Sequence, residues 1–314
     1  MKVLVADTIH EKGIEILRSE GFEVDVEEVS PRELLERIGE YDALIVRSRT
    51  KVTAEVIERG VNLKVIGRAG VGVDNIDVKS ATERGIKVVN APVASTNSVA
   101  ELTIGHMIAM MRWIPEATQS MKSGKWEKKR FMGRELQGKV LGLVGSGRIG
   151  TEVAKRAQAF GMRTIAYDPY LPKEIAERNG IELLDSLDDL LKEADVVSIH
   201  AALTDETYHM LDYEKLKLMK KGSYIVNCAR GGIIDEEGLY RLLKEGHLAG
   251  AALDVYEKEP PGENPIFSLP NVSLTPHIGA STKEAQRRAA EIIAEEVSAA
   301  LKGGEIRFWV NRGG

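Results

Sequence analysis

Short runs rich in Val and Ile alternate with longer amphipathic segments through the first ninety residues of the chain. The short runs predict β-strands because Gly, Asp or Asn bounds them, and they lie at 3–5, 23–26, 43–46, 65–67 and 87–89. The segments between them predict helices, and Gly21 and Gly39 stand where helix C-caps are expected. Strands that alternate with helices are typical of a parallel sheet covered by helices on both faces.

A second alternation begins near Lys139, after a predicted helix at 97–111. Its strands are predicted at 139–145, 163–168, 195–200, 223–229, 250–256 and 271–277, with spacings that leave room for helices. A last helix is predicted over 282–301; it begins in a capping-box sequence, Ser281 to Glu284, and ends at Gly303 and Gly304. The whole pattern predicts an α/β protein with two doubly wound parallel-sheet domains.

The composition excludes several classes of protein. The 314 residues carry a net charge of −5 at pH 7, which gives no reason to expect nucleic acid or an anionic membrane as a partner. The single cysteine cannot form an internal disulfide, which fits a reducing compartment. No apolar run approaches the roughly 20 residues that span a bilayer. We therefore expect a soluble, cytoplasmic protein.

A glycine-rich loop follows the strand at 139–145. Gly145, Gly147 and Gly150 form the pattern G-x-G-x-x-G between a predicted strand and a predicted helix. Gly145 suits a tight turn, Gly147 lets a pyrophosphate approach the backbone, and Gly150 allows close packing of the helix. The next strand ends at Asp168, whose carboxylate can accept hydrogen bonds from both ribose hydroxyls and would repel a 2′-phosphate. The pattern therefore predicts a site for NAD rather than NADP.

An arginine, a carboxylate and a histidine follow three of the later strands. Arg230 follows the strand at 223–229, Glu259 the strand at 250–256, and His277 the strand at 271–277. Ligands of doubly wound sheets bind beyond the carboxyl ends of the strands, so the three side chains are expected on one edge. Histidine can exchange a hydroxyl proton near neutral pH, a carboxylate can hold its imidazolium, and arginine can grip a substrate carboxylate. These three residue types suit hydride transfer from a hydroxyacid.

Each residue also has a simpler interpretation. Taken alone, Arg230 fits a solvated turn and Glu259 an acidic surface loop, so it is their convergence that favours function. Within its apolar helix, His106 is interpreted as a packing residue, and His200 as a residue that flanks the cofactor. Cys228 is interpreted as a small buried side chain, since no base is evident beside it.

The chain resembles the D-isomer-specific 2-hydroxyacid dehydrogenases over nearly its whole length, and within that family the phosphoglycerate dehydrogenases. The segments that carry the resemblance are VRSRTKVT at 46–53, GRAGVGVDNID at 67–77, ELQGKVLGLVGSGRIG at 135–150, VNCARGGIIDE at 226–236, ALDVYEKEP at 252–260 and PHIGASTKEAQ at 276–286. The resemblance implies a Rossmann NAD-binding domain at 96–284, inserted in a flavodoxin-like substrate domain made of 1–95 and 285–314. It also implies a homodimer or higher homo-oligomer.

The resemblance further implies roles for individual residues. Arg230 would bind the substrate, His277 would be the acid/base, and Glu259 its partner. The cofactor would contact residues of the glycine loop, the ribose-binding acid and the later strand ends, namely Gly145, Gly147, Arg148, Ile149, Gly150, Asp168, Cys228, Ala229, Arg230, Asp254, His277, Gly279 and Ala280. Asp254 would approach the nicotinamide carboxamide.

A phosphorylated substrate requires cations in addition to Arg230. The candidate cations lie in the first domain, at Arg47, Arg49, Lys51 and Arg68, and a basic run at 128–130 is an alternative. Gly70 and Val71, in the loop that Arg68 opens, are further candidates for contact with the substrate. The expected activity is the oxidation of D-3-phosphoglycerate to 3-phosphohydroxypyruvate, the entry to serine biosynthesis. The alternatives are a glyoxylate or hydroxypyruvate reductase, another D-2-hydroxyacid dehydrogenase, and an NAD-sensing co-repressor.

Two departures from the family pattern stand out. The family often has Thr-Pro after the histidine that corresponds to His200, where this chain has Ala201 and Ala202. This change removes a hydroxyl that could contact the cofactor. Many phosphoglycerate dehydrogenases carry a C-terminal regulatory domain that senses serine, whereas this sequence ends at Gly314. Feedback through such a domain is therefore not expected.

Overall fold

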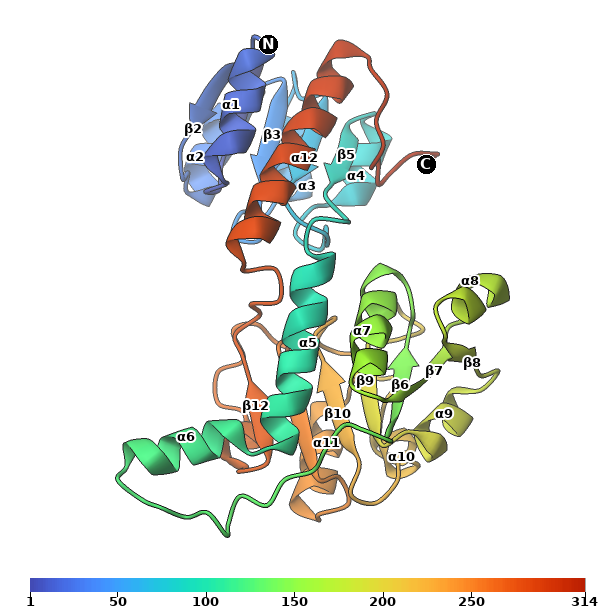
Figure 1. Cartoon of the computed structure of the whole chain (residues 1–314). Helices are drawn as coiled ribbons and strands as arrows, with labels where there is room; N and C mark the ends of the chain where they lie inside the picture. The colour runs from blue at the N-terminus through green and yellow to red at the C-terminus, as the bar shows by residue number, and fades with distance from the viewer. Residues whose placement is uncertain (314) are drawn as a thin grey trace. The chain divides into compact units, whose positions relative to one another are not determined.

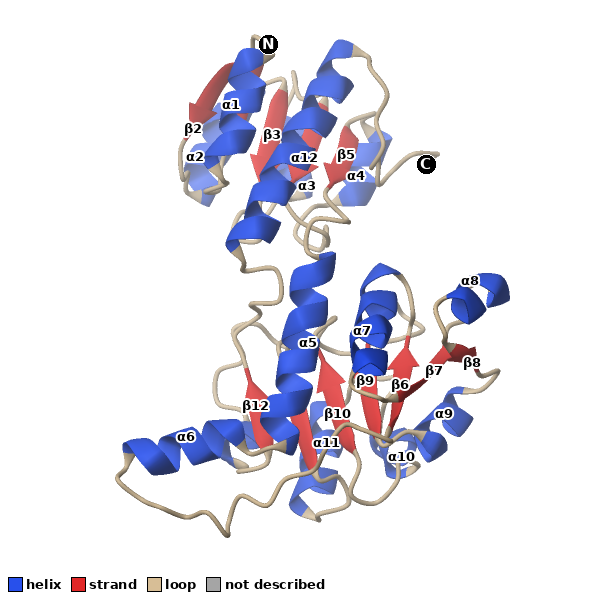
Figure 2. Ribbon diagram, viewed as in Figure 1, coloured by secondary structure: helices blue, strands red, loops and turns tan. Residues whose placement is uncertain are grey.

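The computed structural model describes residues 1–313, which divide into two compact units. One unit comprises Met1–Ser95 together with the chain from Ala280 onward, and the other comprises Thr96–Gly279. Each unit is built on its own parallel sheet, as Figure 1 and Figure 2 show.

The first unit has a five-stranded sheet in the order β2-β1-β3-β4-β5, with every neighbouring pair parallel. This is the flavodoxin-like order, in which the connection changes direction between β1 and β3. Its elements are β1 (Lys2–Val5), α1 (Glu11–Ser19), β2 (Glu23–Val26), α2 (Pro31–Arg37), a 3₁₀ turn (Ile38–Glu40), β3 (Ala43–Val46), α3 (Ala54–Arg59), β4 (Val65–Arg68), α4 (Val78–Glu83), β5 (Lys87–Asn90) and α12 (Lys283–Lys302).

Alternate residues of these strands belong to two separate hydrophobic cores, one on each face of the sheet. Val3 and Val5 of β1 pack with α1 and α12 on one face, while Leu4 packs with α2, α3 and α4 on the other. A sheet that is buried on both faces needs apolar residues at successive positions, which explains the continuous Val, Ile and Leu runs.

The second unit has seven parallel strands in the order β12-β11-β10-β9-β6-β7-β8, the Rossmann order with one further strand. Its elements are α5 (Thr96–Met111), α6 (Ile114–Lys122), β6 (Val140–Val144), α7 (Arg148–Ala159), β7 (Arg163–Tyr167), α8 (Lys173–Arg178), β8 (Glu182–Leu183), α9 (Leu187–Glu193), β9 (Val196–Ile199), α10 (Tyr213–Lys217), β10 (Tyr224–Asn227), α11 (Glu236–Lys244), β11 (Gly250–Leu253), a 3₁₀ turn (Pro265–Ser268) and β12 (Val272–Leu274).

Helices also cover both faces of this larger sheet (Figure 2). α5, α7 and α8 contribute to the core on one face, and α9, α10 and α11 to the core on the other. Leu143 of β6 points to the first core and Val144 to the second, so the alternation seen in the first unit recurs.

The predicted fold class is confirmed, because both units are doubly wound α/β layers with parallel sheets. Two local predictions are wrong. Gly39 does not cap α2 but lies inside the 3₁₀ turn that follows it. The last helix does not begin in a capping box at Ser281; Thr282 is its N-cap and accepts a hydrogen bond from the backbone of Ala285. The two-residue strand β8 was not expected.

No helix among residues 1–313 combines the length and the apolar character that a membrane crossing requires.

Two helical glycines, Gly13 in the first unit and Gly105 in the second, form a pair that tests how α1 packs on α12. A Cβ atom at Gly13 in α1 would lie 2.6 Å from the carbonyl oxygen of Ala290 in α12, whereas a Cβ at Gly105 in α5 would meet nothing within 4 Å. We expect Gly13→Ala to lower the free energy of unfolding by about 1–3 kcal/mol through overpacking. The matched control Gly105→Ala should raise it by about 0.5–1 kcal/mol through helix propensity. Calorimetry on both variants checks this, and equal effects would contradict the close packing of α1 on α12.

Candidate active site

The glycine loop joins β6 to α7 in the shape that its sequence predicts. Gly145 has a φ of +84°, and a Cβ there would lie 3.0 Å from the backbone of His200 and Ala201. A Cβ at Gly150 would lie 2.7 Å from the carbonyl oxygen of Gly145, so the helix could not otherwise pack on the loop. Gly147 is exposed, and a Cβ there would meet nothing within 4 Å. Gly147 is therefore the position of the loop that leaves space for a diphosphate, as its place in the motif predicts.

The N-terminus of α7 is suited to an anion. Gly147 is its N-cap and offers no side chain to the first backbone N–H groups of the helix. Those donors and the helix dipole give the end of α7 a partial positive charge. Arg148 is exposed and Ile149 is half-buried in the first turn. The loop and helix therefore fit the diphosphate of a dinucleotide.

Asp168 lies directly after β7 and is half-buried. Its carboxylate accepts hydrogen bonds from the backbone of Ser146 at 2.7 Å and of Tyr170 at 2.9 Å. A carboxylate has about four acceptor positions, so these two bonds leave capacity for ribose hydroxyls. Asp168 also ties the end of β7 to the glycine loop.

His277 and Glu259 meet at the carboxyl edge of the sheet. The Nδ1 atom of His277 lies 2.6 Å from Oε2 of Glu259, although the two residues stand 18 positions apart in the chain. Glu259 also accepts a hydrogen bond from the backbone of Tyr256 at 3.1 Å, which fixes the other end of its carboxylate. Because Nδ1 is engaged, Nε2 is the nitrogen left to face a substrate.

Asp254 holds the loop that carries His277. Its side chain is 1% exposed and accepts hydrogen bonds from the hydroxyl of Thr275 at 2.6 Å and from the backbone of Ile278 and Gly279 at 2.7 and 2.8 Å. The backbone carbonyl of Asp254 accepts the N–H of His277 at 2.8 Å. His277 has a φ of +52°, a left-handed conformation that a non-glycine residue needs such support to keep.

Arg230 stands in a tightly braced turn after β10. The side chain of Asn227 donates to the carbonyl of Arg230 at 2.8 Å and accepts from the backbone of Ala229 at 3.0 Å. A Cβ at Gly231 would lie 1.7 Å from the carbonyl oxygen of Tyr256, so this turn and the segment after β11 touch backbone to backbone. The turn that bears Arg230 is therefore packed against the segment that leads to Glu259.

Burial controls the ionisation of two residues beside the glycine loop and β10. Burial raises the pKa of the Cys228 thiol to about 12, and the side chain is only 7% exposed, so the thiol stays protonated and inert. Desolvation lowers the pKa of His200 to about 3, and its Nε2 lies 2.8 Å from the hydroxyl of Ser198. His200 is therefore neutral at physiological pH and adds no charge beside the glycine loop.

The structure thus gathers Arg230, Glu259, His277 and the glycine loop on the carboxyl edge of one sheet. Ala280, which was predicted beside the cofactor, belongs to the first unit. Sequence reasoning missed the hydroxyls of Ser273 and Thr275, which bond both ring nitrogens of the buried His106. Thr275 stands two positions before His277, and that proximity was the available signal.

The predicted cationic residues lie at the carboxyl edge of the smaller sheet. Arg49 forms an ion pair with Asp7, in which its Nε lies 3.0 Å from the carboxylate. Another nitrogen of its guanidinium donates to the carbonyl of Ala6 at 2.6 Å. Arg47 donates to the carbonyl of Thr8 at 3.2 Å. Lys51 is exposed.

Arg68 is the last residue of β4 and precedes the loop that contains Gly70 and Val71. Arg68 is half-buried and its guanidinium donates to the carbonyl of Ala69 at 3.3 Å. A Cβ at Gly70 would lie 1.4 Å from this guanidinium, so the absence of a side chain at Gly70 leaves room for it. Val71 is half-buried next to Gly70.

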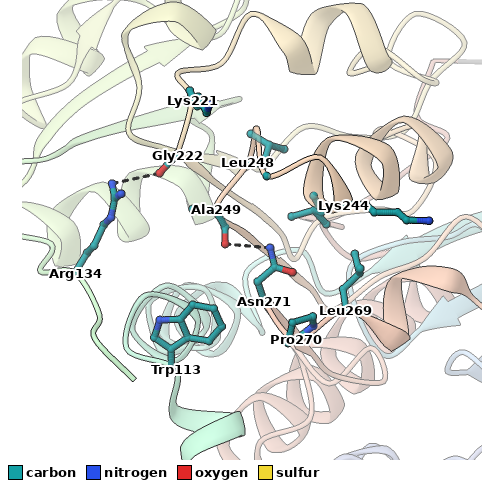
Figure 3. Close-up of a pocket in the computed structure, with 12 residues that line it drawn as sticks. Trp113, Arg134, Lys221, Gly222, Lys244, Leu248, Ala249, Leu269, Pro270 and Asn271 are labelled. Atoms are coloured by element: carbon teal, nitrogen blue, oxygen red, sulfur yellow. Dashed lines mark hydrogen bonds between the residues drawn. The ribbon is translucent and has the colours of Figure 1, made fainter. Parts of the chain in front are cut away.

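Two cavities of the second unit differ in their relation to this site. A mainly apolar cavity of about 530 Å³ opens beside Glu259 and His277 and is lined by Tyr256 and Phe267. A cavity of about 640 Å³, shown in Figure 3, is lined by Trp113, Arg134, Lys244 and the segments that precede β10, β11 and β12. It therefore lies at the amino edge of the sheet, away from the candidate residues.

Comparisons with known proteins show the family of the chain. The family described as D-isomer specific 2-hydroxyacid dehydrogenase, NAD binding domain, matches residues 104–279. The chain is 57% identical over 304 residues to a D-3-phosphoglycerate dehydrogenase of Methanocaldococcus jannaschii, covering 96% of this chain and 58% of that one. It therefore spans little more than half the length of that relative.

Two further proteins match over almost their whole length. A hydroxypyruvate reductase of Thermotoga maritima is 51% identical over 300 residues, covering 94% of this chain and 97% of that one. The crystal structure of a glyoxylate reductase from Paecilomyes thermophila superposes with a TM-score of 0.91 at 34% identity, covering 99% of this chain and 98% of that one. The chain belongs to the D-isomer specific 2-hydroxyacid dehydrogenase family, and residues 104–279 form its NAD-binding domain.

Proposed function

We propose that this protein transfers a hydride between a D-2-hydroxyacid and NAD. The observation that carries the proposal is the 2.6 Å contact between His277 Nδ1 and Glu259 Oε2 in the unit that holds the dinucleotide loop. A histidine held in this way is an acid/base group with a fixed orientation.

The residues divide the chemistry among them. Glu259 accepts the Nδ1–H of His277 and stabilises the positive charge that the imidazole gains when its Nε2 takes the proton of the substrate hydroxyl. Arg230 binds the carboxylate of the substrate and polarises the oxygen on the reacting carbon. Bound NAD supplies the hydride acceptor. The Cys228 thiol stays protonated because burial raises its pKa, so it does not compete with His277 for this proton.

The residues of the cofactor site favour NAD over NADP. The diphosphate would lie at the N-terminus of α7, where Gly147 leaves the backbone open. The carboxylate of Asp168 would accept the ribose hydroxyls and repel a 2′-phosphate.

We propose D-3-phosphoglycerate as the substrate and 3-phosphohydroxypyruvate as the product, in the service of serine biosynthesis. The identity of 57% to a phosphoglycerate dehydrogenase supports this choice. Reduction of hydroxypyruvate or glyoxylate is the second candidate, because the reductase relative matches at 51% identity with nearly equal length. The two candidate reactions use the same reacting groups, and only the oxidation of D-3-phosphoglycerate needs a phosphate-binding cation.

We propose Arg68 as the leading phosphate ligand. Arg49 already uses two of its N–H donors on Asp7 and Ala6, and these bonds brace the loop after β3. Arg68 is the last residue of β4, and the loop that follows it begins with the small residues Ala69 and Gly70.

We further propose that the protein is a homodimer. The segment that follows α6 exposes Trp126 at 80% and Met132 at 82%. Contiguous exposed apolar surface marks interaction sites, and we propose that these two side chains contribute to one. Sedimentation of the wild type and of a Trp126→Ser, Met132→Ser double variant tests the proposal.

The reacting groups are tested by single substitutions. We expect His277→Ala and Arg230→Ala each to lower kcat/KM by roughly 100- to 10,000-fold, because each removes a transition-state interaction. Glu259→Gln should lower kcat while the Kd for NAD stays the same. The control Lys173→Ala, at an exposed position of α8, should keep wild-type values. Near-normal turnover of His277→Ala or Arg230→Ala would show the assignments to be wrong.

The substrate is tested by comparing acids that differ in the phosphate. We expect kcat/KM with NAD to be higher for the D-3-phosphoglycerate couple than for D-glycerate and hydroxypyruvate. Arg68→Gln should raise the KM for the phosphorylated substrate about tenfold and leave that for hydroxypyruvate unchanged. Arg32→Gln, on α2 of the same unit, is the charge-matched control. Equal effects of Arg68→Gln on both substrates would exclude Arg68 as a phosphate ligand.

A further inference from the structure

The buried imidazole of His106 in α5 is not used by the proposed reaction. The residue is 4% exposed, and both ring nitrogens are engaged: Nδ1 lies 2.9 Å from the hydroxyl of Ser273 and Nε2 lies 2.9 Å from the hydroxyl of Thr275. The two partners stand in β12 and directly after it. The imidazole therefore joins α5 to the strand that leads into the His277 loop.

The direction of each hydrogen bond follows from the donors available. The Thr275 hydroxyl lies 2.6 Å from the carboxylate of Asp254, to which it donates its only proton. It must then accept from Nε2–H of His106, which leaves Nδ1 to accept the proton of the Ser273 hydroxyl. This arrangement requires a neutral ring, and burial lowers the pKa of His106 accordingly. Every polar atom in the chain Ser273–His106–Thr275–Asp254 is satisfied.

The same chain ends at the backbone around His277. Asp254 accepts the N–H groups of Ile278 and Gly279 through its carboxylate and the N–H of His277 through its carbonyl. The orientation of the Asp254 carboxylate thus depends in part on Thr275, whose hydroxyl is oriented by His106. His277 keeps a φ of +52° at this point, so small movements of the loop change where its ring points.

We propose that His106 is a positioning residue of the active site, which acts through Thr275 and Asp254 to fix the loop that presents His277. The inference rests on the proposed function of His277 and concerns how that side chain is held.

A packing role alone does not account for these contacts. The helix around His106 is largely apolar, and an aliphatic side chain would fill the position without the cost of burying two polar nitrogens. A buried polar network that is fully bonded rigidifies the elements it joins. Here those elements are α5 and the strand end that bears the acid/base residue.

The test compares two amides of different reach. Gln at position 106 places a donor where Nε2 of the histidine stands, whereas Asn reaches only the position of Nδ1. We expect His106→Leu and His106→Asn to lower kcat by about 10- to 100-fold, with the KM and the Kd for NAD within about twofold of the wild type. His106→Gln should recover kcat to within a few fold. Met107→Ala, which removes a fully buried side chain on the same helix, should lower Tm but leave kcat unchanged.

A second measurement reports how firmly the His277 loop is held and does not depend on turnover. Deuterium uptake of the peptide 275–280 should be faster in His106→Leu and His106→Asn than in the wild type, and near wild type in His106→Gln and Met107→Ala. Wild-type kcat and wild-type uptake in His106→Asn would overturn the proposal. A wild-type enzyme that turns over no hydroxyacid would instead contradict the proposed function, while the uptake series would still decide whether His106 holds the loop.

Discussion

The arrangement of the candidate active site depends on the buried carboxylate of Asp254. At 1% exposure, it accepts hydrogen bonds from one hydroxyl and two backbone groups of the segment 275–279. These bonds stabilise His277 in a left-handed conformation that its side chain would otherwise disfavour. They hold the loop in the conformation in which the imidazole meets Glu259.

The topology of the larger sheet is the second condition on which the site depends. In a parallel doubly wound sheet, all strands end at one edge, so residues that follow β6, β7, β10, β11 and β12 converge there. Gly147, Asp168, Arg230, Glu259 and His277 come from these five connections. The close approach of Gly231 to the backbone of Tyr256 then joins two of the connections directly. A dinucleotide loop and an acid/base pair are thus natural neighbours in this fold.

Much of this could be predicted from the sequence because the signals are local. Valine and isoleucine runs mark strands buried on both faces, and glycine spacing marks the loop after β6. Features set by distant partners could not be predicted. His106 looks like a packing residue because its hydroxyl partners lie 167 and 169 positions away. Arg49 looks like a ligand until Asp7 is found beside it, and the two-residue β8 is too short to leave a periodic pattern. The roles of the site residues stay predictions.

The account is tested most directly by a crystal structure of the complex with NAD and a D-hydroxyacid. It predicts the diphosphate at the N-terminus of α7, the substrate carboxylate on Arg230, and Nε2 of His277 within hydrogen-bond distance of the substrate hydroxyl while Nδ1 remains on Glu259. A complex in which His277 leaves Glu259 or points away from the reacting carbon would contradict it.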